Sequence, residues 1–238
     1  MKQMPALTYD QIRVLNLFGV FTENPDRPLF TLENLHKDFY LTDFRNLMMG
    51  ITQASTETAA VSHFSRRYGM FMAMQFYMLS MYDEIWDGKK VDVRFSLINE
   101  FGVNTLGTFI TPNDYRFVED KEREYVISKL LYQCHEVFQQ FRKTTSISPL
   151  TLWENLFGYM LWNYYEQLEN PLLADRAFED LEILEGTKAW QLFSNKSWFY
   201  QYTGGKNPAD LINKPVRKSC CFSKDIPGLM HCEYCPMK

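Results

Sequence analysis

Most of the chain has the spacing of apolar residues that α-helices show. In residues 119–143 the apolar positions recur at steps of three and four, which places them on one face of a helix. Residues 56–81 are apolar on nearly every side, which predicts a long helix buried in the core. Ser148 followed by Pro149 has the order of an N-cap and a first helical residue, and the helix after that one is expected to end at Gly186.

The first fifty residues have shorter helical patterns. Thr8 and Gln11 have the spacing of a capping box in front of a periodic apolar segment. Residues 32–40 and 44–50 also have helical spacing, so two further short helices are expected there.

One region alternates between apolar and polar residues instead. This alternation over residues 91–97 is the pattern of a half-buried strand, and residues 103–110 are expected to pair with it through a turn at residues 99–102. Two strands alone are marginally stable, so the hairpin must pack on helices. The predicted fold is therefore α+β and helix-dominated, with a short antiparallel β-hairpin.

Several groups of reactive or aromatic residues are more typical of a core than of a site. Cys134 lies in the apolar stripe of residues 119–143, which favours a small buried side chain over a metal ligand, and His135 lies off that stripe. Methionines fill the helix at residues 56–81, as they fill many irregular cores, although a soft-metal site is the alternative. The aromatic residues of segment 190–202 are expected to build core rather than the wall of a ligand site.

Composition and charge narrow the class of protein. The chain has 238 residues, 46% hydrophobic and 23% charged, which suits a folded globule, and its net charge of −4 argues against nucleic acid as the partner. The first 30 residues hold no apolar run of signal-peptide length. The longest uncharged run, residues 68–82, is shorter than the roughly 20 residues of a membrane span. We therefore expect a cytoplasmic protein with at most peripheral membrane contact, in which thiols stay reduced.

The C-terminal part differs from the rest of the chain. Glycines and a proline loosen the pattern at residues 204–208, so we expect a body at residues 1–205 and a separate C-terminal segment at residues 206–238. Four of the five cysteines lie in the last nineteen residues, in the pattern C-C-x10-C-x2-C. These four are Cys220, Cys221, Cys232 and Cys235. Four thiolates are the ligand set of a structural zinc ion or of an iron–sulfur cluster.

The spacing favours two metal atoms over one. In extended backbone, adjacent side chains point to opposite faces, so Cys220 and Cys221 reach two iron atoms more readily than one zinc ion, unless a tight turn brings them together. From Lys214 onward, basic residues outnumber acidic ones, and a positive segment favours a negatively charged 2Fe–2S cluster. The sequence predicts a metal-binding segment, with a 2Fe–2S cluster preferred and zinc left open.

At these residues the chain resembles the siderophore-iron reductases of the FhuF type. The likeness includes adjacent cysteines, ten residues and C-x2-C, with Arg217 and Ser219 before the pair, Pro227 and Gly228 in the spacer, and Pro236 after the last cysteine. Upstream, the segment SPLTLW at residues 148–153 is also similar. The spacer FSKDIPGLMH lacks the tyrosine and the extra glycines expected in the family.

The resemblance implies an oxidoreductase of iron acquisition. Its members are cytoplasmic reductases whose 2Fe–2S cluster passes one electron to Fe(III) in a siderophore, typically a hydroxamate, which then releases Fe(II). An electron donor such as a ferredoxin or a flavin- or NAD(P)H-linked reductase is implied as a second partner. The four cysteines would be the cluster ligands, and a cluster on a mobile C-terminal tail would be exposed to a bulky chelate.

Three other residues are candidates for the site. Arg66 and Arg67 could contact a siderophore or simply cover a solvated helix face, and His231 beside Cys232 could support the metal ligands or replace one of them. Two alternative functions stay open. One is a zinc-stapled binding or adaptor module, and the other is an iron–sulfur electron carrier or redox sensor that has no siderophore site.

Overall fold

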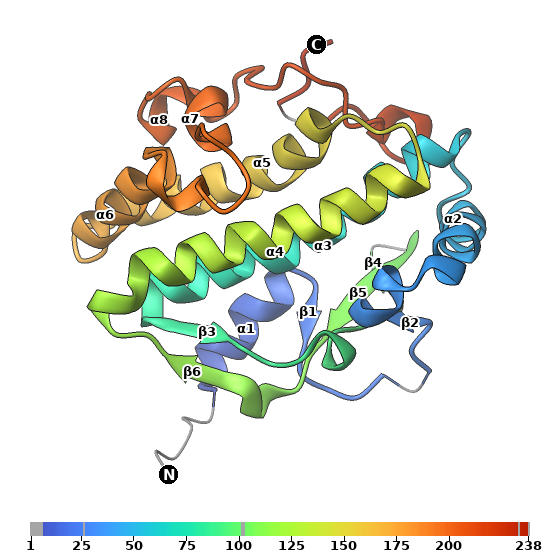
Figure 1. The fold of residues 1–238 in the computed structure, drawn as a ribbon, viewed down its shortest axis with the longest axis horizontal. Coiled ribbons are helices and arrows are strands. Elements are labelled where there is room, and N and C mark those ends of the chain that lie inside the picture. The colour runs from blue at the N-terminus through green and yellow to red at the C-terminus, as the bar shows by residue number, and fades with distance from the viewer. Residues whose placement is uncertain (1–6, 26, 101–102, 233, 238) are drawn as a thin grey trace.

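The computed structural model describes residues 7–25, 27–100, 103–232 and 234–237, and shows a helix-dominated α+β fold (Figure 1). The helices are α1 (Tyr9–Leu17), α2 (Asp38–Thr52), α3 (Glu57–Tyr82), α4 (Arg123–Thr144), α5 (Pro149–Leu168), α6 (Ala174–Glu185), α7 (Trp198–Thr203) and α8 (Pro208–Leu211). The strands are β1 (Val20–Phe21), β2 (Phe30–Thr31), β3 (Glu84–Trp86), β4 (Arg94–Glu100), β5 (Val103–Phe109) and β6 (Tyr115–Phe117). Short 3-10 turns include Leu32–His36, Lys90–Asp92 and Ser223–Asp225.

Helix boundaries follow the caps that the sequence predicts. Thr8 forms the capping box of α1, Ser148 caps α5 with Pro149 in its first turn, and Gly186 ends α6. The prediction for residues 32–50 was wrong in detail. Residues 32–36 form a 3-10 turn and the following helix, α2, is continuous from Asp38 to Thr52.

The antiparallel pairing of β4 with β5 is confirmed, but the hairpin is not alone. It lies inside a four-stranded mixed sheet of order β1-β5-β4-β2, where β1 runs parallel to β5, and β3 pairs with β6 in a second sheet. The predicted start of the first strand at residue 91 was wrong. Val91 is exposed and lies in a 3-10 turn, so the strand begins at Arg94. The rest of the predicted turn, residues 101–102, lies outside the described residues.

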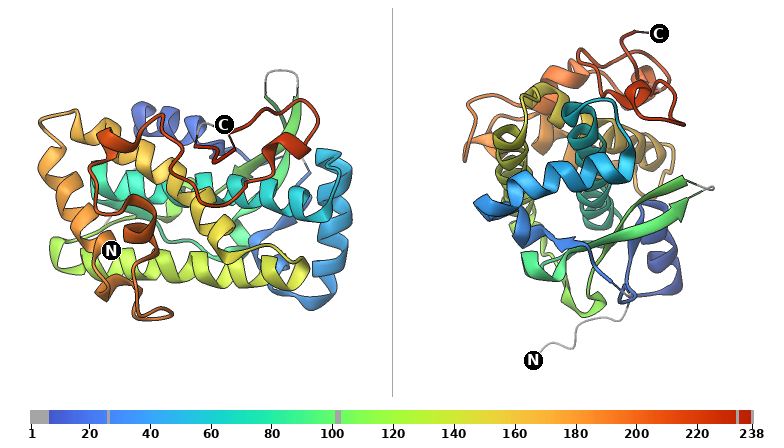
Figure 2. Two further views of the ribbon diagram at one scale, coloured as in Figure 1. Left: turned by 90° about the horizontal axis from the view of Figure 1, so that it is seen from above. Right: turned by 90° about the vertical axis from the view of Figure 1, so that its right-hand side faces the viewer.

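Helix α3 is the centre of the core and packs closely against α5. A side chain at Gly69 of α3 would lie only 3.2 Å from the carbonyl oxygen of Asn155, so the two backbones approach each other directly. Met72, Met74 and Cys134 are all buried, which confirms their predicted structural role. Figure 2 shows α3 in the middle of the molecule, between the other helices and the strands.

The C-terminal segment lies across α5 and the start of α3, on the side opposite β3 and β6 (Figures 1 and 2). Its spacer reaches the loop between α2 and α3, where the Ser55 backbone N–H donates to the carbonyl oxygen of Asp225 over 3.2 Å. The segment therefore contacts the body at several separate points. Among the described residues, none of the helices combines the length and the apolar character that crossing a bilayer requires.

Candidate metal centre in the C-terminal segment

A buried carboxylate of α5 holds the residues that precede the first cysteine pair. The side chain of Glu154 is 1% exposed. It accepts hydrogen bonds from the backbone N–H groups of Lys218, over 2.8 Å, and Ser219, over 3.0 Å, and from the Ser219 hydroxyl. Buried backbone N–H groups outside regular structure need such partners. Glu154 therefore fixes the chain immediately before Cys220.

Arg217, which belongs to the C-terminal segment, also fixes residues 217–219 against α5. Its guanidinium is buried, lies 3.8 Å from the Glu154 carboxylate, and donates to the carbonyl oxygens of Glu154 and Thr151. It also donates to the carbonyl oxygen of Ser219 over 3.2 Å. This arginine, which belongs to the family-like motif, ties the segment to the first turns of α5.

Helix α3 holds the backbone of Cys221. The Ser62 hydroxyl donates to the carbonyl oxygen of Cys221 over 2.8 Å. The Asn155 amide in turn donates to the hydroxyls of Ser62, over 3.1 Å, and Ser65, over 2.7 Å. A buried polar network therefore connects α5, α3 and the first cysteine pair.

The four thiols differ in burial and in contacts. Cys221 and Cys235 are 4% and 3% exposed, whereas Cys220 and Cys232 are half-buried. Cys221 and Cys232 shift each other's pKa in opposite directions, which places the two thiols side by side although eleven positions separate them along the chain. The fold therefore brings one cysteine of the first pair against one of the second.

Backbone N–H groups point at the other two sulfurs. The N–H of Phe222 lies 3.3 Å from Cys220 Sγ, and the N–H of Met237 lies 3.4 Å from Cys235 Sγ. Phe222 adopts a left-handed conformation, with φ of 60°, at this turn. Hydrogen bonds to sulfur stabilise thiolate charge and tune the potential of iron–sulfur clusters.

The charge around the Cys221–Cys232 contact favours one shared proton. The hydrogen bond from Cys232, assisted by Ser223 and by the charge of Arg217, lowers the pKa of Cys221 to about 4. The same contact raises the pKa of Cys232, because the neighbouring thiolate disfavours a second negative charge. Cys221 is therefore the thiol of this pair that loses its proton more readily, and metal binding would require both thiols to be deprotonated.

The donor set fits a four-thiolate cluster in type and number, and two of its members are already in contact. Within the described part of the chain, however, no group of three or more His, Cys, Asp or Glu side chains is gathered as a metal site. The expectation that the tail exposes its cysteines was wrong for two of the four. Cys221 and Cys235 are buried, and polar contacts from α3 and α5 hold the segment around Cys221 against the body.

A cavity of about 570 Å³ opens beside Cys232. Its walls are formed by Arg66 of α3, by α5, and by the tail. The apolar part of the wall includes Tyr159, Trp162 and Met230, and the Met230 side chain is 86% exposed. His231 also lines this cavity. A ligand in this space would lie next to one of the four sulfurs.

The two candidate arginines have different positions. Arg66 donates to the Ser223 hydroxyl, which in turn lies 3.2 Å from Cys221 Sγ. Arg67 instead forms a two-pronged ion pair with Glu100 of β4, at 3.2 and 2.7 Å. Arg66 therefore belongs to the cysteine site, whereas the guanidinium of Arg67 is paired with a carboxylate of the sheet.

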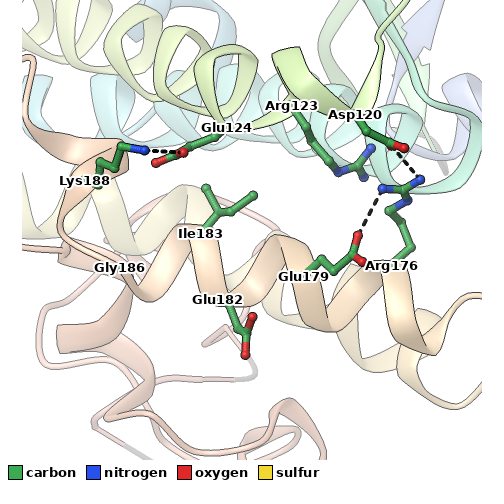
Figure 3. A pocket seen from close by; sticks show the side chains of 9 residues that line it. All are labelled: Asp120, Arg123, Glu124, Arg176, Glu179, Glu182, Ile183, Gly186 and Lys188. Carbon is green, nitrogen blue, oxygen red and sulfur yellow. Dashed lines mark hydrogen bonds and ion pairs between the residues drawn. The ribbon is translucent and has the colours of Figure 1, made fainter.

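A second hollow, of about 640 Å³, lies between α6 and the start of α4 and has no cysteine in its lining (Figure 3). Most of the charged side chains that line it form ion pairs. Arg176 binds Asp120 and Glu179, and Lys188 binds Glu124. These pairs leave the hollow with little free charge for a ligand.

Comparisons with family models, curated proteins and solved structures find no significant match to this chain. Sequence reasoning missed Glu154 and Asn155, the two polar residues of α5 that fix the cysteine segment. The one signal was their place directly after the family-like segment at residues 148–153, where two polar residues interrupt an apolar helix.

Proposed function

We propose that the protein is a cytoplasmic ferric-siderophore reductase of the FhuF type. Cys220, Cys221, Cys232 and Cys235 would hold a 2Fe–2S cluster, which when bound supplies one-electron transfer. The observation that carries the proposal is the contact between Cys221 and Cys232, which joins the two cysteine pairs at the edge of a cavity.

The polypeptide contributes position and environment. Glu154 and Arg217 hold the first cysteine pair against α5, and Ser62 holds the backbone of Cys221. Two buried sulfurs limit the access of water and oxygen, while half-buried Cys232 faces the cavity. Such an arrangement protects the centre and leaves one side open to a substrate.

The cavity suits a metal chelate of moderate size. Its volume of about 570 Å³ lies within the range of small-molecule sites, roughly 300–1,000 Å³. Tyr159, Trp162 and Met230 provide apolar surface for the organic part of a chelate. Hard oxygen donors such as hydroxamates bind Fe(III) much more tightly than Fe(II), so one added electron favours release of the iron.

The first experiment is spectroscopic. The protein purified without oxygen is expected to be red-brown, to contain iron and acid-labile sulfide in equal amounts, and to give an S = 1/2 EPR signal after dithionite reduction. A colourless protein with one zinc ion would overturn the proposal and leave a zinc-stapled module.

The second experiment is turnover. The dithionite-reduced protein, freed of excess reductant and mixed with ferrioxamine, is expected to reoxidise as Fe(II) appears in a ferrozine trap. The Cys134→Ser variant is the control, since Cys134 lies in the core of α4 and far from the tail in sequence. A protein that holds a cluster but reduces no ferric chelate would instead be an electron carrier or a redox sensor.

A further inference from the structure

We infer that Arg66 is a positioning residue that acts through the cysteine sulfurs and raises the reduction potential of the centre they form. This inference rests on the proposed function, because it concerns the cluster that the four cysteines would hold. It adds a residue from the body of the protein, more than 150 positions before the first ligand, to the control of that centre.

The position of Arg66 carries the inference. Its guanidinium donates to the Ser223 hydroxyl, and that hydroxyl is 3.2 Å from Cys221 Sγ. Arg66 and Cys232 line the same cavity. Tyr159, Cys221 and Cys232 all raise the pKa of the guanidinium, so it stays protonated at every working pH.

The charge of Arg66 is not neutralised by a carboxylate among the residues that the structure describes, where no ion pair involves it. The two neighbouring arginines differ in this respect. Arg67 is paired with Glu100, and Arg217 lies against Glu154. Arg217 also acts on the two thiols, but its charge is shared with Glu154, whereas Arg66 reaches Tyr159, Ser223 and the two thiols without a carboxylate partner among the described residues.

A positive charge beside the centre favours its reduced form. Reduction adds one electron and hence one negative charge, and the Coulomb energy of that charge depends on the cations near it. Net charge and hydrogen bonding to the sulfurs are established controls of iron–sulfur potentials. Removing the charge of Arg66 should therefore make the centre harder to reduce.

The test is an anaerobic redox titration followed by EPR and visible absorbance. The neutral variants Arg66→Gln and Arg66→Met are expected to lower the ratio of reduced to oxidised centre about tenfold at a fixed solution potential. That change corresponds to 59 mV for a one-electron couple. Arg66→Lys should restore most of the ratio, because it keeps the charge. Arg67→Gln, one residue further along α3, should leave the ratio unchanged.

The outcomes separate this inference from the proposed function. A wild-type protein without a cluster would end the proposed function. A loaded Arg66→Gln or Arg66→Met variant with the wild-type potential would overturn the inference alone. The inference would also be overturned if both neutral variants failed to load a cluster while Arg66→Lys loaded one, since Arg66 would then serve assembly rather than potential.

Discussion

Two buried carboxylates, each beside an arginine, hold different parts of this protein. Asp180 of α6 binds Arg123 of α4 through two hydrogen bonds, at 2.6 and 2.8 Å, and Arg123 also reaches Asp83 at the end of α3. Glu154 of α5 also lies beside Arg217. Its carboxylate oxygens, however, accept hydrogen bonds from the backbone N–H groups of Lys218 and Ser219 and from the Ser219 hydroxyl.

The difference lies in what else holds the partners together. The helices that Asp180 joins already share an apolar core, so the ion pair adds to packing that sets their positions. The residues at 217–219 have no regular structure, and their polar groups need partners from the body. Losing Asp180 should therefore weaken the body, whereas losing Glu154 should free the segment that carries the cysteines.

The largest expected effect separates the cysteines of these two regions. A Cys→Ser change at position 220, 221, 232 or 235 should abolish the visible colour and the EPR signal, because a serine hydroxyl is a poor ligand for the cluster. Cys134→Ser should keep both signals and cost about 1–3 kcal/mol of unfolding free energy, since it places a hydroxyl in an apolar core. Loss of iron from the Cys134 variant would contradict this separation.

The next effect tests the two carboxylates directly. Asp180→Asn should lower the unfolding free energy of the body by about 3 kcal/mol, the low end of the cost of breaking a buried ion pair, because buried Arg123 loses one charged partner and keeps Asp83. Glu154→Gln should cost about 1.5–3 kcal/mol, the value of hydrogen bonds to a charged group, and should act mainly on the tail.

Urea unfolding measures the first effect, and limited proteolysis with mass spectrometry locates the second. In Glu154→Gln, cleavage should appear near residues 217–230 while the helical core resists. Cleavage spread evenly along the Glu154→Gln chain would show that this carboxylate supports the whole fold.

Local signals in the sequence predicted much of this structure. The capping box at Thr8, the Ser148–Pro149 start of α5 and the stripe that contains Cys134 depend on neighbours a few residues away, and all three are confirmed. Strands β1 and β2 have two residues each and pair with partners far along the chain, so no periodicity can reveal them.

The candidate site also combines residues that a local pattern reveals with residues whose role depends on distant partners. The cysteine pattern is a local signal and names its residues directly. Glu154 gives no such signal, because its partners lie more than sixty positions away and its role depends on how the tail folds back on α5. For that reason the burial of Cys221 and Cys235 could not be predicted either.

The pH dependence of stability offers a smaller effect at the border between body and tail. His63 of α3 lines a cavity of about 520 Å³ with Ile226 and Pro227 of the spacer. Burial, assisted by the charges of Arg67 and Arg66, lowers the pKa of His63 to about 3.

The unfolded chain takes up a proton at this residue near pH 6.5, whereas the folded protein resists doing so. Stability should therefore fall as the pH drops from about 6.5 towards 3, by up to about 1.4 kcal/mol per pH unit from this group. His63→Gln should reduce that slope, as measured by urea unfolding at pH 7, 6, 5 and 4.5. Identical slopes for the variant and the wild type would show that His63 is protonated in the folded protein.

The last comparison uses one glycine in the core of the body and one that faces the tail. At Gly69, a methyl group would meet the backbone of Asn155 and Leu156 at 3.2 and 3.3 Å, and backbone cannot move easily, so Gly69→Ala should cost about 1–3 kcal/mol. At Gly158, it would meet the Tyr234 ring of the tail at 3.3 Å.

A ring on an irregular segment can shift by a few tenths of an ångström, and alanine favours a helix by roughly 0.5–1 kcal/mol over glycine. Gly158→Ala should therefore leave the unfolding free energy nearly unchanged and alter only the EPR line shape, because Tyr234 lies between Cys232 and Cys235. Gly50→Ala, an exposed site of α2 with open space around it, is the matched control and should gain about 0.5–1 kcal/mol. If Gly158→Ala lowered the unfolding free energy as much as Gly69→Ala, the tail around Tyr234 would be packed as rigidly as the contact between α3 and α5. The proposed difference in rigidity between body and tail would then be wrong.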